Sequence, residues 1–142
     1  MRKSYFALFT AIIWLIVIYN ITASPSATGS NTLNIIHTSL GISEPVAEIL
    51  NYLIRKLAHI TVFGFLAIIL YFVFKKNRVF KAWLCTTLYA GTDEIHQLLV
   101  SGRTSSIFDV MIDSFGAIVA LTVLTYAIKR YKQRSQRNVV TN

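Results

Sequence analysis

The sequence is poor in charged residues and in cysteine, and both shortages restrict what the protein can be. Only 14% of its 142 residues are charged, whereas soluble domains carry about 25%. A soluble core of this size could not bury a hydrophobic content of 54%. A membrane protein is therefore favoured over a soluble one. The single cysteine, Cys85, excludes an internal disulfide bond.

Internal repeats and long low-complexity segments are also absent, and the apolar residues gather in four runs. A helix needs about 20 apolar residues to cross a hydrocarbon core of about 30 Å. The sequence therefore predicts an all-α, multi-pass membrane protein with four transmembrane helices, at about residues 5–21, 57–74, 82–100 and 107–128. The third helix contains Asp93, Glu94, His96 and Gln97. It is the least apolar, and we expect it to rely on its neighbours for insertion.

The first apolar run has a second interpretation. Arg2 and Lys3 precede it and "TASPSA" follows it, as in a cleaved signal peptide. The run is longer than the apolar region of a usual signal peptide. We therefore expect a retained helix.

Acidic residues are missing from one side of the predicted topology. Eleven of the 14 lysine and arginine residues precede the first helix, lie between the second and third, or follow the fourth. The positive-inside rule makes that side cytoplasmic, with both termini inside. Residues 129–142 then form a basic cytoplasmic tail that binds anionic lipid of the inner leaflet. Basic residues at the ends of apolar runs fit membrane topology better than nucleic-acid binding, so no nucleic-acid partner is expected.

The segment before the second helix begins polar and then becomes amphipathic. Ser43 suits an N-cap and Pro45 the first turn of a helix. An amphipathic helix is predicted at the outer face, running into the second transmembrane helix. For residues 22–40 an ordinary extracellular loop is an equally good interpretation.

The outer side carries all six acidic residues and all three histidines, with the remaining basic residues Arg55, Lys56 and Arg103. At about 1.5 Å per residue, His59, His96 and Asp113 lie roughly 22–24 Å from the inner ends of their helices. Ionisable residues inside a span cost about 2.5–3.5 kcal/mol each at the bilayer centre. They should therefore pair with one another around a cavity open to the outside.

Spacing refines this cluster. Asp93 shares a helix face with His96 and Gln97, whereas Glu94 is turned about 100° away toward a different neighbour. The candidate acid–base residues are His59, Asp93, Glu94 and His96. The candidate substrate-binding residues are Arg55, Lys56, Gln97, Arg103, Asp109 and Asp113. Gly116, Ala117 and Ala120 form a small-residue strip where the fourth helix can approach another closely.

Three motifs resemble those of the VanZ-like family of small bacterial integral membrane proteins. They are R-K-x-x-H from Arg55, D-E-x-H-Q from Asp93, and G-R-x-x-x-x-x-D-x-x-x-D from Gly102. The resemblance covers about residues 55–123. It implies a place in the bacterial cytoplasmic membrane and an association with resistance to the glycopeptide teicoplanin. It implies no reaction.

Three kinds of function remain open from the residues. One is an enzyme or binder acting on a phosphate- or carboxylate-bearing, lipid-linked envelope precursor, although Ser101, Ser105 and Ser106 are nucleophile candidates only by proximity. A second is a non-catalytic structural or lipid-binding protein. A third is a metal site, since His59, His96, Asp93, Asp109 and Asp113 include zinc-type ligands. No H-E-x-x-H motif occurs, so no metal or other cofactor is assigned.

Overall fold

The computed structural model describes residues 2–24, 27–100, 103 and 105–140, and within them the secondary structure consists of helices joined by turns, without strands. Its helices are α1 (Arg2–Ala23), α2 (Gly29–Leu40), α3 (Glu44–Val73), α4 (Arg78–Gln97) and α5 (Ile107–Val140). The predicted all-α class is confirmed.

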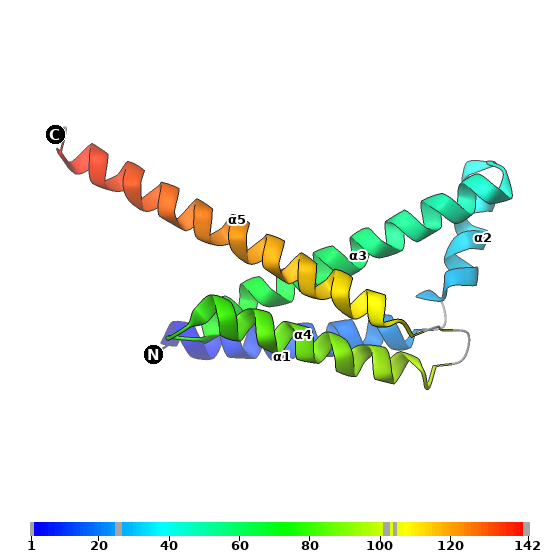
Figure 1. The fold of residues 1–142 in the computed structure, drawn as a ribbon, viewed down its shortest axis with the longest axis horizontal. Helices are drawn as coiled ribbons and strands as arrows, with labels where there is room; N and C mark the ends of the chain where they lie inside the picture. Colours follow the sequence, from blue (N-terminus) through cyan, green and yellow to red (C-terminus); the bar gives the residue numbers. More distant parts are fainter. Residues whose placement is uncertain (1, 25–26, 101–102, 104, 141–142) are drawn as a thin grey trace.

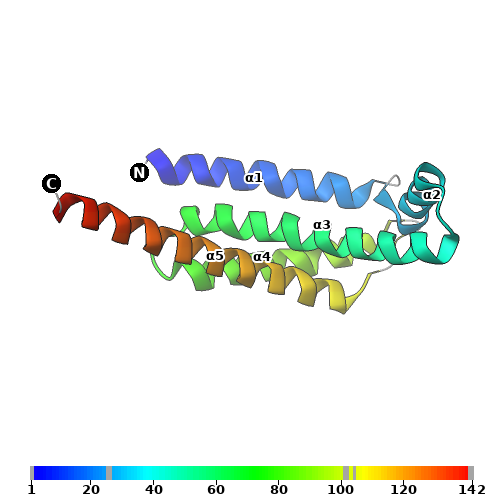
Figure 2. The same ribbon diagram turned by 90° about the horizontal axis from the view of Figure 1, so that it is seen from above.

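The four long helices run along the molecule in alternating directions (Figure 1). Both termini lie at one end, and α2 lies toward the other, the end at which α4 finishes and α5 begins (Figures 1 and 2). Helix α3 is central, because it contacts each of the other helices. The arrangement brings the polar parts of α3, α4 and α5 to the end that carries α2.

Three helical segments are long and apolar enough to cross a membrane: Ser4–Ala23, Glu44–Val73 and Ile107–Asn138. Large apolar side chains on them point outward, such as Phe6 (74% exposed) and Val123 (62% exposed). Soluble proteins rarely expose contiguous apolar surface of this extent. Length and composition thus support three of the four predicted spans.

Helix α4 is turned inside out relative to a helix of a soluble protein. Its polar residues Thr86, Asp93 and Glu94 are buried, whereas Leu88 and Ile95 are more than 60% exposed. The inward polar residues lower its mean hydropathy, which explains why α4 is not among the apolar spans. Its exposed face nevertheless carries large apolar side chains, among them Leu84, Leu88 and Ile95.

The segment between α1 and the predicted second transmembrane helix is mostly helical. The predicted amphipathic helix and second transmembrane helix form one helix of 30 residues, α3, about 45 Å long. It has Ser43 at the N-cap position and proline in its first turn, as predicted, but the Ser43 hydroxyl makes no capping hydrogen bond. For residues 22–40 the alternative of an ordinary loop does not hold over Gly29–Leu40, because these residues form α2. Helix α2 ends where Gly41 adopts a φ of 61°.

Two helix ends differ from the predicted positions. Helix α4 ends at Gln97, whereas about residue 100 was predicted. Helix α5 does not stop near residue 128 but continues to Val140, so the described part of the basic tail is helical. Lysine, arginine and glutamine are good helix formers, and no glycine or proline interrupts them there.

Helices α3 and α5 approach each other closely where the predicted small-residue strip lies. A Cβ atom added to Gly116 would stand 2.8 Å from the carbonyl oxygen of Ile60. One added to Gly64 would stand 3.2 Å from the Cβ of Ala120. Ala117 is fully buried beside them. The use of this strip for close helix approach is confirmed.

Replacing Gly116 with alanine should therefore destabilise the fold, because the new methyl group meets backbone atoms that cannot rotate away. Overpacking of this kind costs about 1–3 kcal/mol. The matched control is Gly91→Ala on α4, where an added Cβ meets nothing within 4 Å and alanine should gain about 0.5–1 kcal/mol of helix propensity. Unfolding in detergent would measure both variants, and equal stabilisation by the two would contradict the described crossing.

Candidate functional site

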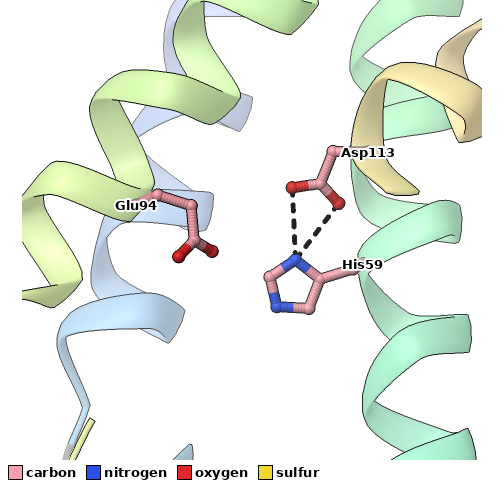
Figure 3. A group of neighbouring side chains, drawn as sticks. All are labelled: His59, Glu94 and Asp113. Carbon is pink, nitrogen blue, oxygen red and sulfur yellow. Dashed lines mark hydrogen bonds and ion pairs between the residues drawn. The ribbon is translucent and has the colours of Figure 1, made fainter. Parts of the chain in front are cut away.

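The ionisable residues of three helices meet at the end of the molecule that carries α2. His59 of α3, Glu94 of α4 and Asp113 of α5 converge there (Figure 3). The Nδ1 atom of His59 lies 3.1 and 3.3 Å from the two carboxyl oxygens of Asp113. Each of the three residues offers a ligand atom, and these atoms all lie within 4.8 Å of one another. The predicted common depth of His59 and Asp113 agrees with this contact.

Asp93 faces the opposite side of the same cluster, toward α1. The Thr22 hydroxyl donates a 2.7 Å hydrogen bond to one of its oxygens, and Gln97 Nε2 donates a 2.8 Å bond to the other. The same Gln97 nitrogen lies 3.3 Å from Glu94 Oε1. Glu94 Oε2 accepts a 2.8 Å bond from the backbone N–H of Ser106. Gln97 thus joins the two carboxyl groups of α4.

Arg103 closes the cluster from the connection between α4 and α5. It donates to the side-chain oxygen of Gln97 at 3.0 Å, and to the carbonyl oxygens of Ile21 at 3.2 Å and Ala27 at 3.0 Å. Its buried Nε atom has no partner in the described chain. Burial lowers the pKa of Arg103 below its ordinary value, and nearby Arg55 acts in the same direction. Arg103 therefore ties the end of α1 to the end of α4.

The neighbouring residues Arg55 and Lys56 have different surroundings. Lys56 forms an ion pair with Asp109 of α5. Arg55 is half-buried and makes no hydrogen bond or ion pair with any described residue. Its guanidinium lies against Gly29, where a Cβ atom would be only 2.6 Å from Arg55 Nη1. The glycine at the start of α2 thus leaves room for the free guanidinium.

His96 faces α1, as Asp93 does, but it makes no hydrogen bond to the described residues of the cluster. Its ring stacks on Tyr19 of α1, with centroids 4.3 Å apart, and its buried Nδ1 has no partner in the described chain. The centre of the cluster lies between the directions of Asp93 and Glu94. At about 100° per residue, Gln97 points there and His96 points about 110° away.

Two cavities adjoin this cluster. One, of about 200 Å³, lies between α1 and α3 and is mostly apolar; its lining includes Ile18, Ile21, Ile54, Val62, Phe63 and His59. The other, of about 470 Å³, is more polar; its lining includes Gly29, Ser30, Asn51, Lys56, Ser106 and Asp109. Arg55 and Arg103 line both cavities.

Several residues of this region were not among the sequence candidates. Asn51 donates a 2.9 Å bond to the carbonyl oxygen of Gly29 and accepts a 2.7 Å bond from Thr32, so it holds α2 to α3. Its position four residues before Arg55 continues the polar stripe of α3, a signal that the sequence contains. No comparable polar stripe in the sequence pointed to Thr22.

The two described serine candidates, Ser105 and Ser106, show no hydrogen bond from their hydroxyl groups to a histidine or carboxyl group. The Ser106 hydroxyl accepts a 3.2 Å bond from the N–H of Phe108 in the first turn of α5. Ser105 is half-buried, and no hydrogen bond of its hydroxyl is described. Ser101 and Gly102 lie outside the described residues.

The Thr22–Asp93 bond gives a test of the α1–α4 contact. Thr22→Val keeps the side-chain shape but removes the donor to a buried carboxyl group, which should cost about 1.5–3 kcal/mol. Thr10 is the matched control, because its hydroxyl bonds only to Phe6 of its own helix. Thr10→Val should change stability by less than about 0.5 kcal/mol. Equal losses of unfolding free energy in detergent would contradict the described contact.

Comparison with known proteins identifies the family of the chain. No curated protein and no solved structure shows significant similarity to the chain. The VanZ/LLP1 family matches residues 4–129, which include α1, α2, α3, α4, Arg103 and most of α5. The chain is therefore a member of the VanZ/LLP1 family.

Proposed function

We propose that the chain crosses the bacterial cytoplasmic membrane four times, with both termini inside. The alternating helix directions and the shared end of the termini support this topology (Figure 1). The basic residues of α5 and of the connection between α3 and α4 lie toward that end. Helix α4 is the fourth span, because its outer face is apolar and its polar face is covered by α1, α3 and α5.

We further propose that the outer end binds a phosphate- or carboxylate-bearing, lipid-linked envelope precursor. The observation that carries this proposal is the pair of guanidiniums, Arg55 and Arg103, that lines both cavities. Neither is within ion-pair distance of a carboxyl group in the described chain. Arginine binds phosphate and carboxylate through paired hydrogen bonds, so two such groups in one place favour an anion.

The two cavities match the two parts of such a ligand. An anionic head group would lie in the polar cavity, near Arg55, Arg103 and Lys56. A hydrocarbon chain would enter the apolar cavity between α1 and α3. An anion alone would not need the apolar cavity, and a neutral lipid would not need the arginines. Binding of a precursor in this way would lower susceptibility to teicoplanin, as the family resemblance implies.

The rest of the cluster favours a structural role. Thr22, Asp93, Gln97 and Arg103 bond mainly to one another and hold α1, α4 and the connection after α4 together. Arg55 makes no such structural hydrogen bond. A substitution at Arg55 therefore tests ligand binding without disturbing the fold, whereas a substitution at Arg103 would affect both.

Arg55→Gln should weaken binding of farnesyl phosphate to the purified protein in neutral nanodiscs by about tenfold or more, because a charge-assisted hydrogen bond of about 1.5–3 kcal/mol is lost. Farnesol and inorganic phosphate should bind more weakly to the wild type than farnesyl phosphate does. Lys76→Gln is the matched control, since Lys76 is exposed at the opposite end. Unchanged affinity in Arg55→Gln would refute the proposed site, and phosphate release would show whether the ligand is also hydrolysed.

The same variants test the link to glycopeptides. Expression in a susceptible bacterial host should raise the teicoplanin concentration needed to stop growth. Arg55→Gln should lose this protection at a normal membrane level, whereas Lys76→Gln should keep it. Binding of farnesyl phosphate without protection would contradict the resistance function and leave the binding site in place.

A further inference from the structure

The convergence of His59, Glu94 and Asp113 has a chemistry of its own. The three residues come from three different helices, and their side chains point at one another (Figure 3). Glu94 is 3% exposed and Asp113 is 1% exposed. A buried imidazole between two buried carboxyl groups supplies three ligand atoms in one small volume.

The charges of this trio do not balance. His59 is the cationic partner of Asp113 in the described ion pairs, and Glu94 has none. Glu94 instead accepts hydrogen bonds from neutral groups, Gln97 and the Ser106 backbone. With both carboxyl groups ionised, a protonated His59 would still leave one net negative charge. Arg103 acts on Glu94 as a nearby charge, without an ion-pair contact, and a buried charge that is only partly compensated costs free energy.

The distances suit a metal ion. Two ligands of a tetrahedral ion with bonds of about 2.0–2.1 Å are about 3.3 Å apart. The Nδ1 atom of His59 is 3.1 and 3.3 Å from the oxygens of Asp113. The ligand atom of Glu94 lies within 4.8 Å of the other two. Closing on a shared ion would move its carboxyl group by an amount on the order of 1–1.5 Å.

We propose that His59, Glu94 and Asp113 form a binding site for a divalent transition-metal ion, with Zn²⁺ and Mn²⁺ as the ions to test. A mixed imidazole and carboxylate set suits these ions better than Mg²⁺ or Ca²⁺, which prefer oxygen ligands alone. Gln97 and the Ser106 N–H hold the Glu94 carboxyl group in place, as outer partners of metal ligands commonly do. The proposed set includes Glu94 and leaves out His96, Asp93 and Asp109 of the sequence hypothesis.

The site borders the cavity that Arg55 and Arg103 also line, because His59 lies in the wall of that cavity. Three protein ligands leave a fourth position of a tetrahedral ion open, as in catalytic zinc sites. An anionic head group near the arginines would then lie next to the ion. The metal site itself does not depend on the proposed lipid-linked ligand.

The test uses the full chain, purified in detergent without a histidine tag and stripped with a chelator. We expect one Zn²⁺ or Mn²⁺ ion to bind per chain and to raise the Tm, and Mg²⁺ to bind about tenfold more weakly or worse. Asp113→Asn and Glu94→Gln keep the side-chain shapes but remove a charged ligand. Each should weaken Zn²⁺ binding about tenfold or more.

Two variants serve as matched controls. Asp109→Asn changes the same residue type one turn earlier on α5, at a carboxyl group paired with Lys56. His37→Gln removes an exposed histidine on α2, outside the proposed ligand set. Both should bind Zn²⁺ as the wild type does.

Absence of stoichiometric Zn²⁺ and Mn²⁺ binding by the stripped wild type would overturn the proposal, and so would equal affinities in Asp113→Asn and Asp109→Asn. Size-exclusion chromatography would show whether Glu94→Gln still folds, because Glu94 also bonds to Gln97 and Ser106. If it does not, Asp113→Asn and His59→Gln decide the outcome.

Discussion

The contact between the backbones of α3 and α5 is the constraint on which the rest of the structure depends. Gly116 lies against Ile60 without a side chain between them. The residues just toward the α2 end of this crossing, His59 and Asp113, are therefore brought within hydrogen-bond distance. About a turn farther along, Lys56 meets Asp109. A wider crossing would separate both pairs, so the polar site requires the small-residue strip.

Helix α4 completes the site by carrying its polar residues inward. Asp93 bonds toward α1, Glu94 faces α3 and α5, and Gln97 connects the two. These groups would be costly against lipid. Because their partners lie inside the helix bundle, the structure favours the rotation of α4 about its axis that turns these groups inward. Arg103 then joins the end of α4 to the end of α1. Arg55 takes no part in this network, which is why the proposed ligand site centres on it.

The sequence predicted the helices and the depth of the polar residues better than it predicted their directions. Apolar run lengths identified the long helices, and helical rise placed His59 and Asp113 at one level. Helical rise says nothing about which neighbour a residue faces, so His96 was placed in the cluster although it stacks on Tyr19. The contacts of Thr22 and Asn51 depend on how α1 and α2 pack, which no local pattern encodes. The helical continuation of α5 followed from residue propensity that the predicted tail overlooked.

The inward polar face of α4 also bears on the order of synthesis at the ribosome. The partners of Asp93 are Thr22, which is made earlier, and Gln97 of the same helix. His59, which faces Glu94, is also made earlier. Asp93 can therefore find its partners as soon as the helix emerges, before α5 exists. Arg103, the Ser106 N–H and Asp113 arrive later, and so does Ser114 of α5, which accepts hydrogen bonds from Trp83 and Thr87 of α4. In the proposed topology, the preceding chain thus supplies the partners of Asp93 first, and the following chain completes the polar contacts of α4.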